Sequence, residues 1–284
     1  MTARERLGRL GIWSSLWTLA AQSGDAERRQ AAADAAAEVD DLGYGAIWLG
    51  SSPPVESAGP VLDATPRLTV ATGITSIWQH DAATVDAQRA RLEERHPGRF
   101  LLGLGVSHGE AIPAYAHPYA AMQRYLDELT APAGDVVLAA LGPRMLGLSR
   151  DRAAGAHPYL VTVEQVAEAR QILGPAPVLA PELSVVLDTD PGRARETARG
   201  MLRRYLRMRN YTTSFVRGGY TEDDFQDGGS DRLIDALFAL GDADAIAARV
   251  QAFHDAGADH VAIQAIVAAG DDQRDVWRRL HGAS

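Results

Sequence analysis

The chain alternates short apolar runs with longer alanine-rich stretches in which apolar residues recur at helical spacing. An apolar run of four to eight residues between turn residues is typical of a buried strand. Eight such runs predict strands over residues 10–13, 46–49, 68–74, 100–106, 136–140, 157–161, 178–187 and 260–266.

The stretches between these runs predict helices. They cover residues 25–42, 81–95, 119–130, 144–153, 163–173, 190–207, 232–240, 242–256 and 272–281. Gly43 is a suitable stop for the first helix, and Asp242 is a suitable N-cap for the eighth. The link after the second strand is short and rich in serine and proline.

Strands that alternate with helices indicate βαβ units and a parallel sheet, hence an α/β fold. Eight units in 284 residues favour one closed (β/α)8 TIM barrel that spans the chain as a single domain. An open doubly wound sheet is the alternative, but Trp13-Ser14-Ser15 stands where its glycine-rich turn would follow the first strand. Residues 208–229 are polar and rich in glycine, and we interpret them as an insertion between strands 7 and 8 that could serve as a lid.

The amino-acid composition excludes several kinds of catalytic site and partner. The chain contains no cysteine, which excludes thiol nucleophiles and cysteine-ligated metals and fits a cytoplasmic protein. All 28 basic residues are arginine, so Schiff-base chemistry on lysine is also excluded. The net charge of −9 and the scattered arginines argue against nucleic acid as a partner. No apolar run is long enough to span a membrane, and the first ten residues do not resemble a signal peptide.

Active sites of (β/α)8 barrels lie at the C-terminal ends of the strands. That rule selects aromatic, hydroxyl and glycine residues and few acids, with no cluster of metal ligands. The candidates are Trp13, Ser14, Gly73, Ile74, Trp78, His80, Ser107, His108, Gly109, Glu110, Leu141, Gly142 and Thr162. Two histidines and one acid elsewhere, His157, His260 and Glu182, lie early in their predicted strands, which favours structural roles.

Two turns are candidates for binding phosphate. Residues 105–109 (Gly-Val-Ser-His-Gly) and residues 141–143 (Leu-Gly-Pro) each place flexible backbone N–H groups between a predicted strand and the next helix. The N-terminus of a helix attracts anions.

Several segments resemble the bacterial luciferase-like flavin and deazaflavin enzymes. They are Ala-Thr-Gly-Ile at 71–74, His-Pro-Gly-Arg-Phe-Leu-Leu-Gly-Leu-Gly at 96–105, Leu-Ala-Ala-Leu-Gly-Pro-Arg at 138–144, Gly-Ala-His-Pro-Tyr-Leu-Val-Thr at 155–162, Asp-Thr-Asp-Pro at 188–191 and Ala-Gly-Ala-Asp-His-Val at 256–261. Their order and spacing are most similar to the actinobacterial branch of coenzyme F420-dependent oxidoreductases.

This resemblance implies a barrel, usually a homodimer, that binds coenzyme F420 or, alternatively, FMN at its mouth. It implies a non-proline cis peptide at Gly73–Ile74 that supports the ring, with Trp13 beside it as a wall. It also implies phosphate contacts from Ser107, His108, Gly109, Leu141 and Gly142. Trp13, Ser14, Trp78 and Thr162 are then the candidates for contacting a small-molecule substrate.

One departure bears on the reaction. The sugar-phosphate dehydrogenase branch of the resembled family has an Asp-His pair after strand 2, whereas this chain has Gly-Ser-Ser-Pro-Pro at 50–54. Without that base, we expect reduction of an activated C=C or C=N bond, with His108, His80, a tyrosine or water as proton source and Glu110 as a relay. An FMN-dependent monooxygenase and a non-catalytic barrel that has lost its cofactor are the alternatives.

Overall fold

The computed structural model describes residues 1–110, 112 and 115–282. Its centre is a curled parallel sheet in the order β10-β9-β11-β1-β2-β3-β5-β6-β7-β8, with β4 also paired to β5. The strands are β1 (Leu10–Ser14), β2 (Ala46–Leu49), β3 (Thr69–Thr72), β4 (Thr75–Ser76), β5 (Phe100–Gly105), β6 (Val136–Leu138), β7 (Gly155–Ala156), β8 (Val178–Leu179), β9 (Glu182–Val186), β10 (Phe238–Leu240) and β11 (Val261–Ala265).

The segment that carries β8 and β9 joins the two ends of this sheet. On one side, the N–H groups of Ala180 and Glu182 donate to carbonyls of residues 156 and 158, next to β7. On the other side, β9 pairs with β11 in register, Ala262 opposite Glu182. The barrel therefore closes, which confirms the predicted (β/α)8 TIM-barrel fold.

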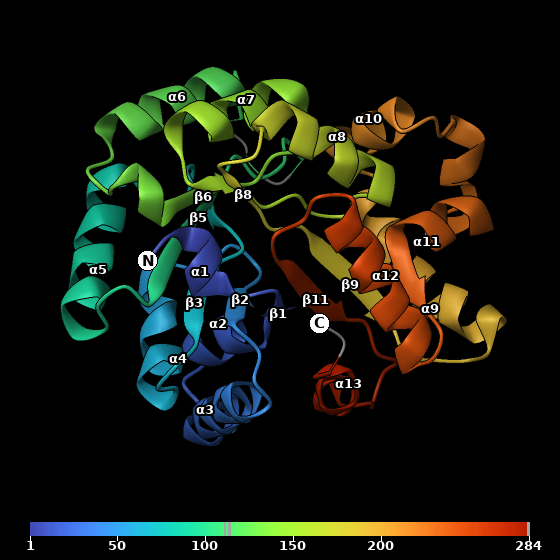
Figure 1. Cartoon of the computed structure of the whole chain (residues 1–284), viewed down its shortest axis with the longest axis horizontal. Coiled ribbons are helices and arrows are strands. Elements are labelled where there is room, and N and C mark those ends of the chain that lie inside the picture. The colour runs from blue at the N-terminus through green and yellow to red at the C-terminus, as the bar shows by residue number, and fades with distance from the viewer. Residues whose placement is uncertain (111, 113–114, 283–284) are drawn as a thin grey trace.

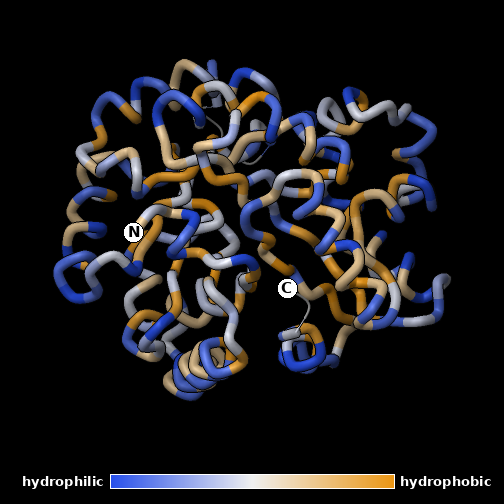
Figure 2. The backbone as a smooth tube through the Cα atoms, viewed as in Figure 1, coloured by the Kyte–Doolittle hydropathy of each residue, from blue (hydrophilic) through white to orange (hydrophobic). Residues whose placement is uncertain are grey.

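Helices surround the sheet (Figure 1). They are α1 (Ala3–Leu7), α2 (Leu16–Ala21), α3 (Ala26–Asp41), α4 (Gly59–Ala64), α5 (Ala82–Arg95), α6 (Pro118–Glu128), α7 (Pro143–Arg152), α8 (Val163–Leu173), α9 (Pro191–Tyr205), α10 (Arg209–Arg217), α11 (Asp231–Leu237), α12 (Ala243–Asp255) and α13 (Gln273–Leu280), with 3-10 turns η1 (Val55–Ala58), η2 (Ala133–Asp135) and η3 (Glu222–Gly228). The hydrophobic backbone segments lie mainly in the strands, and the outer helices are largely hydrophilic (Figure 2). This distribution matches a sheet buried on both faces.

Local chemistry explains where the long helices begin. The side chains of Asp25, Asp81 and Asp242 accept hydrogen bonds from first-turn N–H groups of α3, α5 and α12. Such caps satisfy donors that a helix cannot satisfy by itself. The predicted helix boundaries are therefore confirmed to within one or two residues at these sites.

The segment after β9 packs as a second hydrophobic core beside the barrel. Its buried residues come from α9, α10, α11 and β10, among them Leu202, Phe215, Leu233 and Phe238. The predicted insertion, residues 208–229, forms α10 and η3 within this core. It is thus an ordered part of the molecule that packs against the preceding helix α9.

Three expectations about secondary structure are wrong. Strand 6 lies at Gly155–Ala156 rather than at 157–161, because the chain leaves the sheet there and Leu160 takes a left-handed φ of 52°. Residues 238–240 form strand β10 on the edge of β9 instead of ending a helix. The link after β2 contains η1 and the short helix α4.

Candidate active site

A cavity of about 450 Å³, called here the central cavity, lies at the C-terminal ends of the barrel strands. Its lining comes from the ends of β1, β3, β5, β6 and β7 and from helices α9 and α10. The lining residues are Trp13, Ser51, Ser52, Gly73, Ile74, Gln79, Val106, Ser107, His108, Ile112, Tyr115, Ala139, Ala140, Leu141, Met145, His157, Tyr159, Arg204, Tyr205, Asn210 and Tyr211. This is the end of the barrel at which catalysis is expected.

Gly73 makes room for two ring nitrogens in this cavity. The Gly73–Ile74 peptide is cis, which confirms that prediction, and it separates β3 from β4. A Cβ on Gly73 would lie 2.7 Å from Nε1 of Trp13 and 3.5 Å from Nε2 of His157. Both nitrogens are buried, and neither has a hydrogen-bond partner within the described part of the chain.

His157 is held in place from two sides. Its Nδ1 lies 2.6 Å from the carbonyl oxygen of Ala180, and its ring stacks on Trp48 at 4.0 Å between centroids. Burial lowers the pKa of His157 to about 4, so the ring is neutral at pH 7. Because β7 ends at residue 156, His157 lies at the mouth of the barrel, where its ring lines the central cavity.

Three tyrosines form one wall of the central cavity. The hydroxyl of Tyr159 donates to Oε1 of Gln264 at 2.7 Å and lies 3.0 Å from the hydroxyl of Tyr205. Tyr211 meets Tyr205 edge-on, at 4.9 Å between ring centroids. Burial raises the pKa of all three tyrosines, so they carry protons at neutral pH.

His108 faces this wall. Its Nδ1 lies 3.2 Å from Oδ1 of Asn210, and its ring lies 5.3 Å from that of Tyr211. Burial lowers the pKa of His108, which leaves it neutral at pH 7. Glu110 is exposed and accepts a hydrogen bond from the N–H of Arg209, which lowers the pKa of Glu110. A relay through Glu110 would therefore begin from a carboxylate.

A second cavity of about 500 Å³, called the outer cavity, shares Tyr115, Leu141 and Asn210 with the central cavity. Its other lining residues are Gly109, Glu110, Gly142, Arg209, Thr213 and Arg217.

Backbone groups and arginines meet in the outer cavity. Helix α7 begins after Gly142, which has no side chain to cap the first-turn N–H groups. Arg217 reaches the carbonyl of Leu141, and a Cβ on Gly142 would lie 2.8 Å from Nη1 of Arg217. Among the residues with described positions, neither Arg209 nor Arg217 is in an ion pair. The outer cavity therefore offers positive charge and free N–H groups to an anion.

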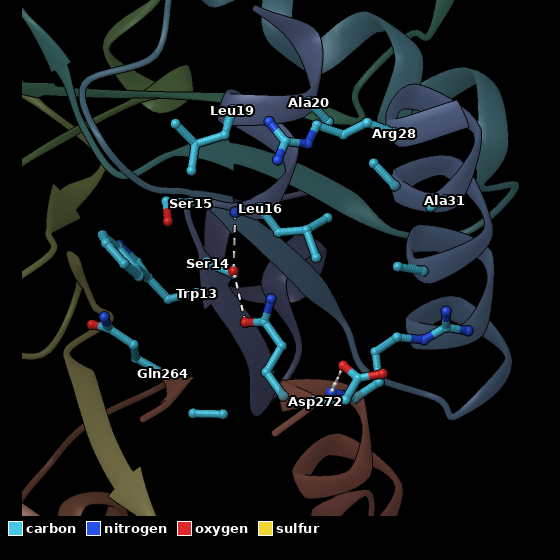
Figure 3. A pocket seen from close by; sticks show the side chains of 15 residues that line it. Trp13, Ser14, Ser15, Leu16, Leu19, Ala20, Arg28, Ala31, Gln264 and Asp272 are labelled. Carbon is cyan, nitrogen blue, oxygen red and sulfur yellow. Dashed lines mark hydrogen bonds between the residues drawn. The ribbon is translucent and has the colours of Figure 1, made fainter. Parts of the chain in front are cut away.

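A third cavity of about 540 Å³, the side cavity, lies where β1 and β11 end (Figure 3). Trp13 and Gln264 are on one side of it, and Arg28 and Ala31 of α3 are on the other (Figure 3). Trp13 lines both this cavity and the central one.

The side cavity also contains one of the predicted substrate contacts. The hydroxyl of Ser14 donates to Oε1 of Gln273 at 2.9 Å and accepts from the N–H of Leu16.

The structure brings most of the predicted site residues together. Six line the central cavity: Trp13, Gly73, Ile74, Ser107, His108 and Leu141. Gly109, Glu110 and Gly142 line the outer cavity, and Ser14 lines the side cavity.

The other three predicted residues lie outside these linings. His80 accepts a hydrogen bond from Tyr125 through its backbone carbonyl. The indole of Trp78 donates to the carbonyl of Val106, so it supports the wall from behind. The hydroxyl of Thr162 caps helix α8. Direct contact with cofactor or substrate is not supported by these positions.

Sequence reasoning missed the residues that the second core contributes. These are Tyr159, Arg204, Tyr205, Arg209, Asn210, Tyr211 and Arg217. Tyrosines within an otherwise polar, arginine-rich stretch were the available signal. The side chain of Glu182 was placed at the far end of the barrel, yet it reaches the N–H of Leu160 in the loop beyond β7.

Within residues 1–110, 112 and 115–282, no three histidine or acidic side chains are arranged to hold a metal ion. In the same residues, no helix combines the length and apolar character needed to cross a membrane.

Comparison with known proteins supports the luciferase-like resemblance. Residues 10–131 match the luciferase-like monooxygenase family. Similar solved structures include an F420-dependent secondary alcohol dehydrogenase in complex with an F420-acetone adduct (13% identity, 97% of this chain and 98% of that chain, TM-score 0.72). They also include the coenzyme F420-dependent tetrahydromethanopterin reductase of Methanopyrus kandleri (15% identity, 96% of this chain and 97% of that chain, TM-score 0.69).

A third is the oxygenating constituent of 3,6-diketocamphane monooxygenase from Pseudomonas putida in complex with FMN (13%, 96% of this chain and 96% of that chain, TM-score 0.67). No curated protein sequence matches the chain. Identities this low establish a shared fold only. Residues 10–131 therefore resemble the luciferase-like monooxygenase family, and the whole chain shares its fold with the three solved structures.

Proposed function

We propose that the chain is an oxidoreductase that uses coenzyme F420 to reduce an activated C=C or C=N bond in a small organic substrate. The observation that carries this proposal is that the central and outer cavities adjoin, with Tyr115, Leu141 and Asn210 lining both. A flat ring fits the central cavity, which is rich in aromatic side chains, and an anionic tail fits the arginine-lined outer one. The F420 tail carries glutamates as well as a phosphate, so it uses more of this charge than the single phosphate of FMN.

The residues present suit such a cofactor. Gly73 has no side chain at the floor of the central cavity, and a Cβ at this position would collide with Trp13. The uncapped start of α7 and Arg217 would hold the phosphate, while Arg204 and Arg209 are placed for the rest of the tail. Bound in its reduced form, the cofactor supplies a hydride.

The protein itself positions the ring and the substrate, excludes water from them and delivers a proton to the product. Hydride addition to a C=C or C=N bond leaves a negative charge that one proton neutralises. The tyrosines of the cavity wall hold their protons at neutral pH, and neutral His108 carries one on Nδ1 towards Asn210. We assign the proton to Tyr211 or to water held near His108, both at the central cavity.

We place the reacting bond of the substrate in the central cavity, beside the ring and Tyr211, and the rest of the substrate past Trp13 in the side cavity. Its position at the ends of β1 and β11 is on the catalytic side of the barrel. The alanines of α2 and α3 offer an apolar surface there, and Arg28 offers positive charge at the rim (Figure 3).

Fluorescence titration of the purified protein with coenzyme F420 and, separately, with FMN tests this function. We expect micromolar or tighter binding of F420, at least tenfold tighter than FMN, and a steeper loss with added salt. Arg209→Gln and Arg217→Gln should weaken F420 more than FMN, while Arg207→Gln, outside the cavity linings, should change neither. Preference for FMN would indicate a flavin monooxygenase instead, and binding of neither would leave a non-catalytic barrel.

The expected homodimer stays a prediction. Sedimentation or light scattering of the purified protein measures it directly, and a monomer would contradict the expectation.

A further inference from the structure

Two buried nitrogens at the floor of the central cavity differ in hydrogen-bonding character. Nε1 of Trp13 carries a hydrogen and can only donate. The carbonyl of Ala180 can only accept, so Nδ1 of His157 carries the ring hydrogen in that 2.6 Å contact. Because the ring is neutral, Nε2 of His157 presents a lone pair and can only accept. The floor therefore offers one donor and one acceptor, both unused within the described residues.

The two atoms lie close together. Both approach the same point beside Gly73, at 2.7 and 3.5 Å, which places them no more than about 6 Å apart. Each nitrogen is buried without a partner among the described residues, and an unpaired buried polar group is unfavourable. A ligand that pairs with both would recover that cost.

The packing fixes both rings in advance. The indole of Trp13 lies against Gly50, where a Cβ would be 2.4 Å from Cη2, and against Tyr159 at 5.3 Å between centroids. His157 is held by Ala180 and by its stack on Trp48. The spacing of donor and acceptor is thus a property of the protein before any ligand arrives.

We infer that this pair recognises the cyclic imide edge of a flavin-type ring. Such an edge has an N–H, at N3, between two carbonyl oxygens. Nε2 of His157 accepts from the N3 hydrogen, and Nε1 of Trp13 donates to an adjacent carbonyl oxygen. Flavins and deazaflavins share this edge, so the inference rests on the proposed cofactor class and is independent of which member binds.

The wild-type protein provides the first test. Kd is measured by fluorescence for F420 and for its N3-methyl derivative, and for FMN and 3-methyl-FMN. Methylation removes the N3 hydrogen and leaves the phosphate and the tail unchanged. We expect each methylated ring to bind at least tenfold more weakly than its parent. Equal binding would overturn the inference, and a single bridging water would then be the partner of the two nitrogens.

Matched variants provide the second test. His157→Phe keeps an aromatic ring on Trp48 and should abolish the difference between parent and methylated rings. His254→Phe is the control, because His254 also bonds a backbone carbonyl through Nδ1 and also has an unpaired Nε2, but lies on α12. It should keep the full difference.

The indole side has its own measurement. The N–H signal of Trp13 in a ¹⁵N-correlated spectrum should shift on binding of either ring and be missing in Trp13→Phe. The indole of Trp277 is also unpaired and lies outside the cavity linings, so its signal should stay in place.

The outcomes separate this inference from the proposed function. If F420 binds and N3-methylation has no effect in wild-type protein, the inference fails while the function stands. If FMN alone binds and N3-methylation weakens it, the inference stands and the choice of F420 fails. If neither ring binds, both fail.

Discussion

The buried carboxyl of Glu182 makes stability depend on pH in a direction that can be measured. Glu182 is 1% exposed, and its two hydrogen-bond partners, the N–H of Leu160 and the hydroxyl of Ser184, are uncharged. Burial raises the pKa of Glu182 from 4.5 to about 7 in the folded protein. Glu182→Gln keeps the shape but cannot ionise; its oxygen can accept from the N–H of Leu160 and its NH2 group can donate to the hydroxyl of Ser184.

The direction of the pH effect on stability depends on whether the folded or the unfolded state binds the proton of Glu182 more tightly. The folded state holds this proton more tightly than the unfolded chain, so the stabilisation is fully present below pH 4.5. It is lost as the pH rises, by about 1.4 kcal/mol per pH unit, until the folded pKa near 7 is passed. The total loss is about 3 kcal/mol, a large part of the free energy of unfolding of a typical domain.

Urea denaturation at several pH values between 4.5 and 8.5 measures this effect. The free energy of unfolding of wild type minus that of Glu182→Gln should fall by about 3 kcal/mol across the range. Buried histidines titrate in both proteins, so their contributions cancel in the difference. Glu94→Gln, at an exposed position, should run parallel to wild type. A constant difference between wild type and Glu182→Gln would refute the argument.

Three further predictions concern the scaffold and the side cavity. Thr162→Ala should lower the free energy of unfolding by about 1 kcal/mol through loss of a helix cap, and calorimetry should show this with cofactor affinity unchanged. Gly103→Ala should give no folded protein on gel filtration, because its Cβ would lie 1.8 Å from a backbone oxygen, whereas Gly134→Ala has open space and should fold normally. Ala31→Trp should fill the side cavity and raise the substrate KM with the F420 Kd unchanged, while Gln30→Trp on the same helix should not.

The sequence predicted the barrel because its signals are local. Apolar runs marked seven of the eight barrel strands, and Asp242 marked the start of a long helix that the structure caps in that way. The cis Gly73–Ile74 peptide was implied by the family resemblance of the Ala-Thr-Gly-Ile motif at 71–74. Each of these features depends on neighbours within a few residues.

The misplaced strand 6 shows where local signals stop. Tyr159, Leu160 and Val161 look like a strand, yet Leu160 packs into the second core and Tyr159 into the cavity wall. Apolar character predicts that a residue is buried, and it does not identify the element against which the residue packs. The pairing of β7 with β8 over only two residues cannot be read from the sequence.

Local signals also fail to predict the site residues that come from the second core. Tyr205 and Tyr211 lie about fifty residues beyond β7 and reach the mouth because α9 and α10 fold back over it. The hydrogen bond between Tyr205 and Tyr159 and the ring contact between Tyr211 and Tyr159 depend on tertiary packing alone. The glycine turns at 105–109 and 141–143 could be predicted because they follow strands directly.

The sheet pairing explains why the second core reaches the site. Beyond Glu182, β9 no longer pairs on the β7 side, and β10 occupies that edge instead. The barrel wall therefore opens at its C-terminal end between β7 and β9, and Tyr205, Tyr211 and the arginines of α10 are placed at that opening. Barrel residues then form the floor, which offers uncharged nitrogens, and the second core forms a wall that offers charge. Changes at the floor, such as His157→Phe, should alter ring affinity equally at low and high salt. Changes at Arg209 or Arg217 should alter mainly the salt dependence, because screening acts on charge and leaves neutral hydrogen bonds largely untouched.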